Sequence, residues 1–162
     1  MEQSSNTLTT TSLKLRTLNE LPLVAGIIIV LEYLFLSLPN VSLTPLIFAV
    51  YFAARSYRQS FYLITIYMLV EILQWGFSLW VAPMWIGWVL WAVLVKTTNL
   101  YLPIKGIVFA YLYGLLFMPL TVIVYGVDPI AYMIADFPFA TTMAIGNALT
   151  LMILYKPLTK VL

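Results

Sequence analysis

Long apolar stretches, separated by short polar or proline-containing breaks, are the feature that most constrains how this chain can fold. Hydrophobic residues make up 63% of the 162 residues and charged residues only 9%, against about 45–50% and about 25% in soluble domains. So much apolar surface would aggregate in water, so we expect one domain that folds in a lipid bilayer. This composition excludes a soluble enzyme, a disordered tail and a nucleic-acid-binding domain.

The apolar stretches can be compared with the roughly 20 residues that a membrane-crossing helix needs. Six segments are candidates for such crossings: residues 21–38, 41–54, 61–80, 81–95, 103–125 and 139–155. The second and the fourth are short, and a further small apolar piece, residues 130–135, lies between Asp128 and Asp136. Six crossings are therefore one interpretation, and four crossings with two re-entrant segments are the alternative.

The positions of the basic residues distinguish between these two arrangements. With six crossings and a cytoplasmic amino end, all eight basic residues lie inside or at inner helix ends: Lys14, Arg16, Arg55, Arg58, Lys96, Lys105, Lys156 and Lys160. The outer connections, around 39–43, 80–84 and 126–138, contain no Lys or Arg. This is the bias that the positive-inside rule predicts. We therefore predict an all-α integral membrane protein, a compact bundle of six transmembrane helices with both termini cytoplasmic.

The amino-terminal segment and two missing residue types narrow the chemistry further. Residues 1–19 are polar and rich in Ser and Thr, without the apolar core of a secretory signal. We predict a cytoplasmic tail there and the six-helix domain over residues 20–162.

The chain has no Cys and no His, which excludes thiolate chemistry, Ser-His-Asp catalysis and the common zinc sites. It also has no P-loop motif for ATP hydrolysis. We expect no enzyme, no metal and no cofactor in this chain.

One face of the third predicted helix carries most of the polar groups at membrane depth. Glu71 lies midway along that helix, and helical spacing places Tyr67, Gln74, Trp75 and Ser78 on the same face, which runs toward the outer surface. Ionisable residues inside a bilayer are costly and so indicate function. We expect this face to line a ligand site; the alternative is that its polar groups bond neighbouring helices.

Other polar residues lie at membrane depth in the first and the last predicted helix. Glu32 is in the outer half of the first helix, where pairing with a Tyr hydroxyl or protonation is the alternative to facing a cavity. Asn147 is mid-span in the last helix, where a hydrogen bond to a neighbouring helix is the alternative to ligand contact. Asp128 and Asp136 flank the small apolar piece, where helix capping is the alternative. Because the outer half of the bundle has four acidic residues and no basic one, neutral or cationic ligands are favoured over strongly anionic ones.

The tryptophans are concentrated in the same region, at positions 75, 80, 85, 88 and 91. Trp80 and Trp85 fall at the predicted outer interface, where an aromatic belt is expected. Trp75 and Trp88 lie deeper, where aromatic faces would suit flat or cationic ligands. Trp85, Trp88 and Trp91 recur at a spacing of three and form one stripe on the fourth predicted helix. Packing inside the bundle is the alternative for this stripe.

Several short motifs resemble those of a known family. They are LPNVSLTP at 38–45, LQWGFSLW at 73–80, IADFPF at 134–139, AIGN at 144–147 and LYKPL at 154–158. Together with the six-helix length and topology, they resemble the substrate-binding S components of energy-coupling factor (ECF) transporters, over roughly residues 20–162. The resemblance implies a subunit of the bacterial cell membrane that captures a vitamin or related micronutrient from outside. It also implies partners, a transmembrane coupling subunit and two ATPase subunits that hydrolyse ATP for uptake.

The resemblance also implies where the ligand is bound. The site would lie near the outer surface, under a lid formed by residues 39–41. Combined with the polar residues above, the predicted substrate-binding set is Glu32, Asn40, Glu71, Gln74, Trp75, Trp80, Trp88, Asp136 and Asn147. Metal cargo is not expected, because the nickel and cobalt members use His near their amino end.

The chain departs from the family on its first helix, and a different function is the alternative. The family often has an Ala-xxx-Ala pattern there for docking, whereas here Ala25 is followed by Ile29 at the fourth position. Docking would then use Ala25 and Gly26. The alternative function is a membrane scaffold of the rod-shape-determining MreD type, which needs no ligand. An intramembrane enzyme is disfavoured, since the chain has no His, Cys or paired-carboxylate motif.

Overall fold

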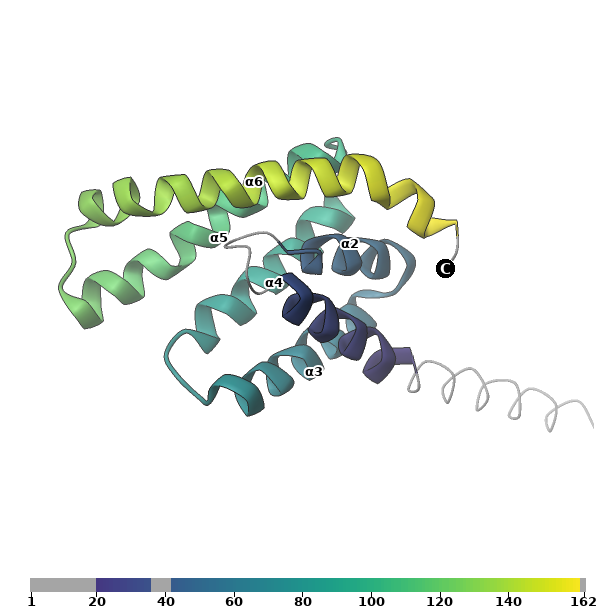
Figure 1. Ribbon diagram of the computed structural model, residues 1–162, viewed down its shortest axis with the longest axis horizontal. Coiled ribbons are helices and arrows are strands. Elements are labelled where there is room, and N and C mark those ends of the chain that lie inside the picture. The colour runs from purple at the N-terminus through teal and green to yellow at the C-terminus, as the bar shows by residue number, and fades with distance from the viewer. Residues whose placement is uncertain (1–19, 36–41, 161–162) are drawn as a thin grey trace, which may run out of the picture.

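The computed structural model describes residues 20–35 and 42–160, and within them the chain is helical and contains no strand (Figure 1). A first helix over residues 20–35 is followed by α2 (Thr44–Ala54), α3 (Tyr57–Trp75), α4 (Val81–Thr97), α5 (Leu102–Tyr125) and α6 (Pro129–Thr159). The predicted all-α class and the number of helices are confirmed. The predicted tail at 1–19 and the predicted lid at 39–41 lie outside the described residues.

Local sequence signals explain several helix ends. The Ser56 side chain accepts a hydrogen bond from the backbone N–H of Gln59, and the Gln59 side chain accepts one from the Ser56 N–H, which is a capping box at the start of α3. The Asp128 carboxylate caps α6 by accepting from two backbone N–H groups of its first turn. Gly76 and Gly126 follow α3 and α5 with positive φ angles of 81° and 66°, a conformation that glycine adopts without steric cost.

The prediction for the end of the third helix was wrong by five residues. Helix α3 ends at Trp75 rather than at Trp80, because Gly76 leaves the helical conformation while its N–H still bonds to the Ile72 carbonyl. Ser78 therefore does not continue the polar face of α3. Trp80 instead lies directly before α4, where it is half-buried.

The prediction of a separate apolar piece at 130–135 was also wrong. That piece and the last predicted span belong to one continuous helix, α6, which contains Pro138 in its interior. Proline ends helices less reliably in apolar surroundings, where neighbouring helices and side-chain hydroxyls compensate the backbone.

Helix α2 occupies the centre of the bundle, with nearly all of its side chains buried. It packs against α4 and α6 more extensively than against its sequence neighbour α3, whereas α5 and α6 pack along each other as an antiparallel hairpin. This hairpin runs along the top of Figure 1, and α3 lies on the opposite side of α2. Consecutive helices are therefore neighbours from α3 to α6, whereas α2 and α3 contact each other only weakly.

A group of aromatic rings forms the core where four helices meet. The ring of Phe48 on α2 lies 5.4 Å from that of Tyr67 on α3 and 4.8 Å from that of Trp88 on α4, centroid to centroid. Trp88 in turn lies 5.5 Å from Phe109 on α5. The indole N–H of Trp91 donates to the Pro45 carbonyl at 2.9 Å. Edge-to-face and offset rings of this kind stabilise a core beyond their buried area.

The outer surface of α5 and α6 is apolar. Among the described residues, these are the two helices that are long and apolar enough to cross a membrane, and α2 and α4 are apolar but shorter. Large side chains such as Ile123, Ile130 and Phe137 are exposed on them. By length and composition, two helices could therefore cross a bilayer.

Candidate ligand-binding site

Two adjoining cavities lie where the first helix, α3 and the beginnings of α2 and α4 meet. The first has a volume of about 240 Å³ and the second about 170 Å³, and Glu32, Ser42, Tyr67 and Met84 line both. Taken together they reach the lower end of the range for small-molecule sites, about 300–1,000 Å³. Of the predicted substrate-binding residues, Glu32, Glu71, Gln74 and Trp75 line the first cavity, and Trp88 and Asn147 line the second.

Glu32 is held in place by the helices on either side of it. One of its carboxylate oxygens, Oε1, accepts a hydrogen bond from the Thr44 hydroxyl at 2.8 Å and another from the Tyr67 hydroxyl at 2.7 Å. Ser42 donates to the Thr44 hydroxyl at 2.8 Å. The carboxylate is therefore positioned by α2 and α3 before any ligand arrives, as a preorganised binding site requires.

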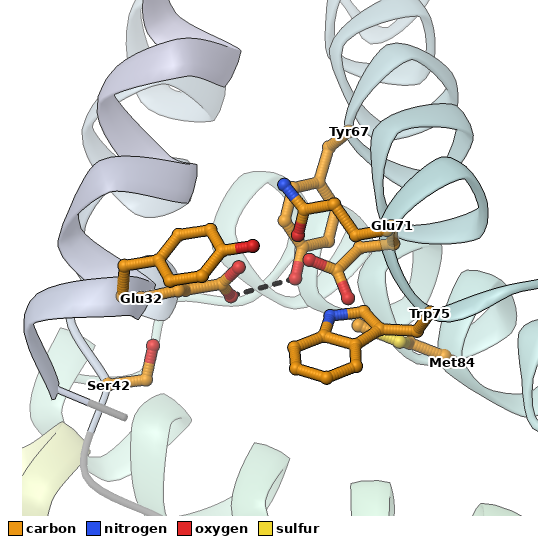
Figure 2. Close-up of a pocket in the computed structure, with 8 residues that line it drawn as sticks. Glu32, Ser42, Tyr67, Glu71, Trp75 and Met84 are labelled. Carbon is orange, nitrogen blue, oxygen red and sulfur yellow. Dashed lines mark hydrogen bonds between the residues drawn. The ribbon is translucent and has the colours of Figure 1, made fainter. Parts of the chain in front are cut away.

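Glu71 lies one helical turn after Tyr67 on α3, so both side chains point to the same side. Figure 2 shows its carboxyl group facing Glu32 across the cavity, with the Trp75 indole beside it. The Glu71 side chain is only 8% exposed. Its carboxyl group is within hydrogen-bonding reach of the Glu32 carboxyl group.

The basic residues gather at the other ends of these helices. Arg55, just after α2, forms an ion pair with Glu20 at the start of the first helix. Lys96 donates to backbone carbonyls at the end of α2, and Lys105 donates to the Val95 carbonyl near the end of α4. Cations are favoured at such helix carboxyl ends. Among the described residues, neither cavity is lined by a Lys or an Arg.

Asn147 and Asp136 are placed differently from the residues around Glu71. Asn147 is buried, and its amide nitrogen donates to the Gly106 carbonyl on α5 at 3.2 Å, so it makes the interhelical bond that was the alternative to ligand contact. It also lines the second cavity. Asp136 lies apart, in a third cavity of about 330 Å³ between α5 and α6, together with Tyr132 and Gly114.

The remaining predicted residues are not part of the two cavities. Trp80 lines neither of them, and Asn40 lies outside the described residues. On the first helix, Ala25 is buried in the bundle, while Gly26 is half-buried and has open space where a side chain would be. Of the predicted docking pair, only Gly26 is placed to meet a partner.

The structure adds residues to the site that the sequence analysis did not name. Ser42 and Thr44, just before and at the start of α2, orient Glu32, and Tyr113 on α5 lines the second cavity. The hydroxyl residues Ser42 and Thr44 come just before Pro45 at the start of an apolar helix, and this pattern could have indicated a polar helix end. Tyr113 carried no such signal, because it is one aromatic residue within a long apolar stretch.

Comparisons of the chain with protein-family models, with curated proteins and with solved structures find no match. The function is therefore inferred from the geometry of the cavities and from the motifs in the sequence.

Proposed function

We propose that the protein is the substrate-binding subunit of an ECF-type importer in the bacterial cell membrane, with its ligand bound in the two cavities. The observation that carries the proposal is a preorganised polar pocket, lined by Glu32, Glu71 and aromatic rings, at one end of an otherwise apolar bundle. The ligand is a vitamin or related micronutrient, neutral or cationic. It enters from outside and is taken up at the expense of ATP that partner subunits hydrolyse.

Exposed apolar side chains support the membrane part of this proposal. The exposed fractions of Ile123, Ile130 and Phe137, on the α5–α6 hairpin, are 81%, 68% and 62%. Large apolar side chains exposed in this way are unfavourable in water and neutral in lipid. We infer that the hairpin faces the hydrocarbon of the bilayer.

The charge distribution supports six crossings with both termini in the cytoplasm. The contacts of Arg55, Lys96 and Lys105 lie at one end of the bundle, and Glu32 and Glu71 lie toward the other. Six antiparallel crossings place the basic end in the cytoplasm, in line with the positive-inside rule. The acidic cavities then open toward the outside, where the ligand is captured.

Helix α2 is short for a crossing, but its position explains why. With 11 residues it is about 16 Å long at 1.5 Å per residue, against a hydrocarbon core of about 30 Å. Because most of α2 is enclosed by other helices, its backbone meets protein rather than lipid over most of its length. Irregular backbone at membrane depth is tolerated under that condition.

The proposed partners are a transmembrane coupling subunit and two ATPase subunits. Since Ala25 is buried, we propose that docking on the first helix uses the open surface at Gly26. The exposed side chains around it, such as Leu23, Ile27 and Val30, would widen this contact.

A scaffold of the MreD type is the second candidate, and one observation favours it. The Tyr67–Glu32 and Asn147–Gly106 hydrogen bonds join different helices, so part of the polar set already stabilises the bundle without a ligand. A scaffold would leave the two cavities empty in its working state.

A thermal-shift screen of the full chain in detergent, against water-soluble vitamins and their precursors, tests the proposal. A ligand that binds only the folded state adds RT ln(1 + [L]/Kd), about 4 kcal/mol at a thousandfold excess over Kd. We expect a large shift with one compound or with a small group of related compounds. A flat screen with a chain whose fold is confirmed by circular dichroism would contradict the importer subunit and favour the scaffold.

A further inference from the structure

We propose that the two cavities bind an aromatic organic cation, with its positive charge between Glu32 and Glu71 and its ring against Trp75. This inference rests on the proposed function and narrows its ligand from neutral or cationic to cationic.

The first argument is the pair of facing carboxyl groups. The hydroxyls of Thr44 and Tyr67 both donate to the same oxygen of Glu32, Oε1, and the Glu71 carboxyl group is within hydrogen-bonding reach of the Glu32 carboxyl group. Glu71 faces it across the cavity (Figure 2) and has no basic neighbour in the lining. Two carboxyl groups this close share a proton instead of both ionising, so the pair carries one negative charge, and the described lining holds no basic residue to balance it. A ligand cation between them balances that charge and donates to their oxygens.

One buried polar group points to a ligand independently of that charge argument. Trp88 is 4% exposed, lines the second cavity, and its indole N–H has no hydrogen-bond partner among the described residues. Buried polar groups are nearly always paired. The ligand therefore carries an acceptor, such as a ring nitrogen or a hydroxyl, at the end that reaches Trp88.

The aromatic lining indicates the rest of the ligand. Trp75 is 58% exposed although it is a large apolar residue, and its indole lies beside the Glu71 carboxyl group. Tyr33, also exposed, lines the same cavity. Exposed aromatic faces next to a carboxylate attract a flat ring that bears a positive charge. The cavity volumes accommodate one substituted ring rather than a large conjugate.

A matched series of compounds tests the charge of the ligand. Pyridoxamine, pyridoxine and 4-pyridoxate share one ring and differ at one position, which carries an ammonium, a hydroxyl or a carboxylate; thiamine adds a different aromatic cation. Titration of the full chain in detergent, followed by calorimetry, is expected to show at least one of the two cations binding tenfold or more tightly than pyridoxine. No binding of 4-pyridoxate is expected.

Variants of the carboxyl groups test the location. Glu71→Gln keeps the size of the side chain and is expected to weaken binding of the cation at least tenfold. Asp128→Asn is the control: it makes the same carboxyl-to-amide change at an exposed residue outside both cavities, and Asn also caps helices well. Its affinity for the cation is expected to equal that of the wild type. Circular dichroism spectra that match the wild type show that both variants fold.

The outcomes separate this inference from the proposed function. Tighter binding of the neutral or the anionic compound, or wild-type affinity of Glu71→Gln for the cation, overturns the inference and leaves an importer subunit with another ligand class. Failure of every vitamin in the thermal-shift screen, with the fold confirmed, overturns both.

Discussion

The contact between α5 and α6 at Gly106 gives the sharpest test of the packing. A Cβ atom at Gly106 would lie 2.7 Å from Cδ1 of Leu151 and 3.1 Å from Cβ of Asn147, against about 3.5–4.0 Å for carbon atoms in contact. The Leu151 methyl can rotate away, but the Asn147 Cβ is fixed to the backbone of α6. The substitution Gly106→Ala therefore forces the two helices apart at the point where Asn147 donates to the Gly106 carbonyl.

The expected cost follows from three contributions. Overpacking of a core costs about 1–3 kcal/mol, and an interhelical hydrogen bond in a membrane contributes about 0.6 kcal/mol. Alanine favours the helix more than glycine does, which offsets this cost by up to about 1 kcal/mol. We expect Gly106→Ala to lower the free energy of unfolding by about 1–2 kcal/mol.

Gly146→Ala on α6 is the matched control, because a Cβ there meets nothing within 4 Å. It gains the helix propensity without the clash, so its stability is expected to equal or exceed that of the wild type. Unfolding of both variants by SDS in mixed micelles, followed by circular dichroism, measures the difference. Equal stability of the two variants would refute the close approach of α5 and α6 at Gly106.

The remaining predictions concern the polar contacts and the aromatic lining. Asn147→Ala leaves the Gly106 carbonyl without its side-chain donor and should destabilise the chain by about 0.6–1.7 kcal/mol in the same SDS assay; no change would contradict the interhelical bond. Arg55→Gln breaks the partly exposed ion pair with Glu20 and should cost less than about 1 kcal/mol. That cost should vanish near about 1 M salt, and a salt-independent loss would contradict a surface pair. Trp75→Ala should weaken vitamin binding by about 0.5–2 kcal/mol if the indole contacts a cation, with an unchanged circular dichroism spectrum; unchanged affinity would remove Trp75 from the site.

The helical class and most helix ends could be predicted because they depend on local signals. Long apolar stretches predict helices whatever surrounds them. Gly126 ends α5 because glycine adopts the left-handed conformation, and Asp128 starts α6 because its carboxylate caps the first turn. The shared face of Glu71 and Trp75 follows from helical spacing alone. These residues do line one cavity, as that spacing implied.

The errors arose where a local signal has two meanings. Gly76 lies within an apolar stretch, which predicts that the helix continues through it, yet it ends α3. Pro138 predicts a helix break, yet α6 continues through it. Whether such a residue ends a helix depends on the surroundings of the backbone, which the sequence of one segment does not contain.

Contacts between distant residues were beyond prediction for a related reason. The hydrogen bond between Glu32 and Tyr67 joins residues 35 positions apart, and the burial of Ala25 depends on how the first helix is rotated against the bundle. Periodicity places residues on a face but does not say which helix that face meets. Partner choice is a property of the packed bundle.

In the proposed function, the acidic cavities open to the outside of a membrane-crossing bundle. Because the chain has no Cys, single substitutions can report sidedness in intact cells with a membrane-impermeant maleimide. Trp75→Cys, at an exposed position lining the first cavity, should react from outside. Arg58→Cys, at an exposed position near the basic end, should react only after the cells are permeabilised. Labelling of Arg58→Cys but not of Trp75→Cys in intact cells would contradict the account.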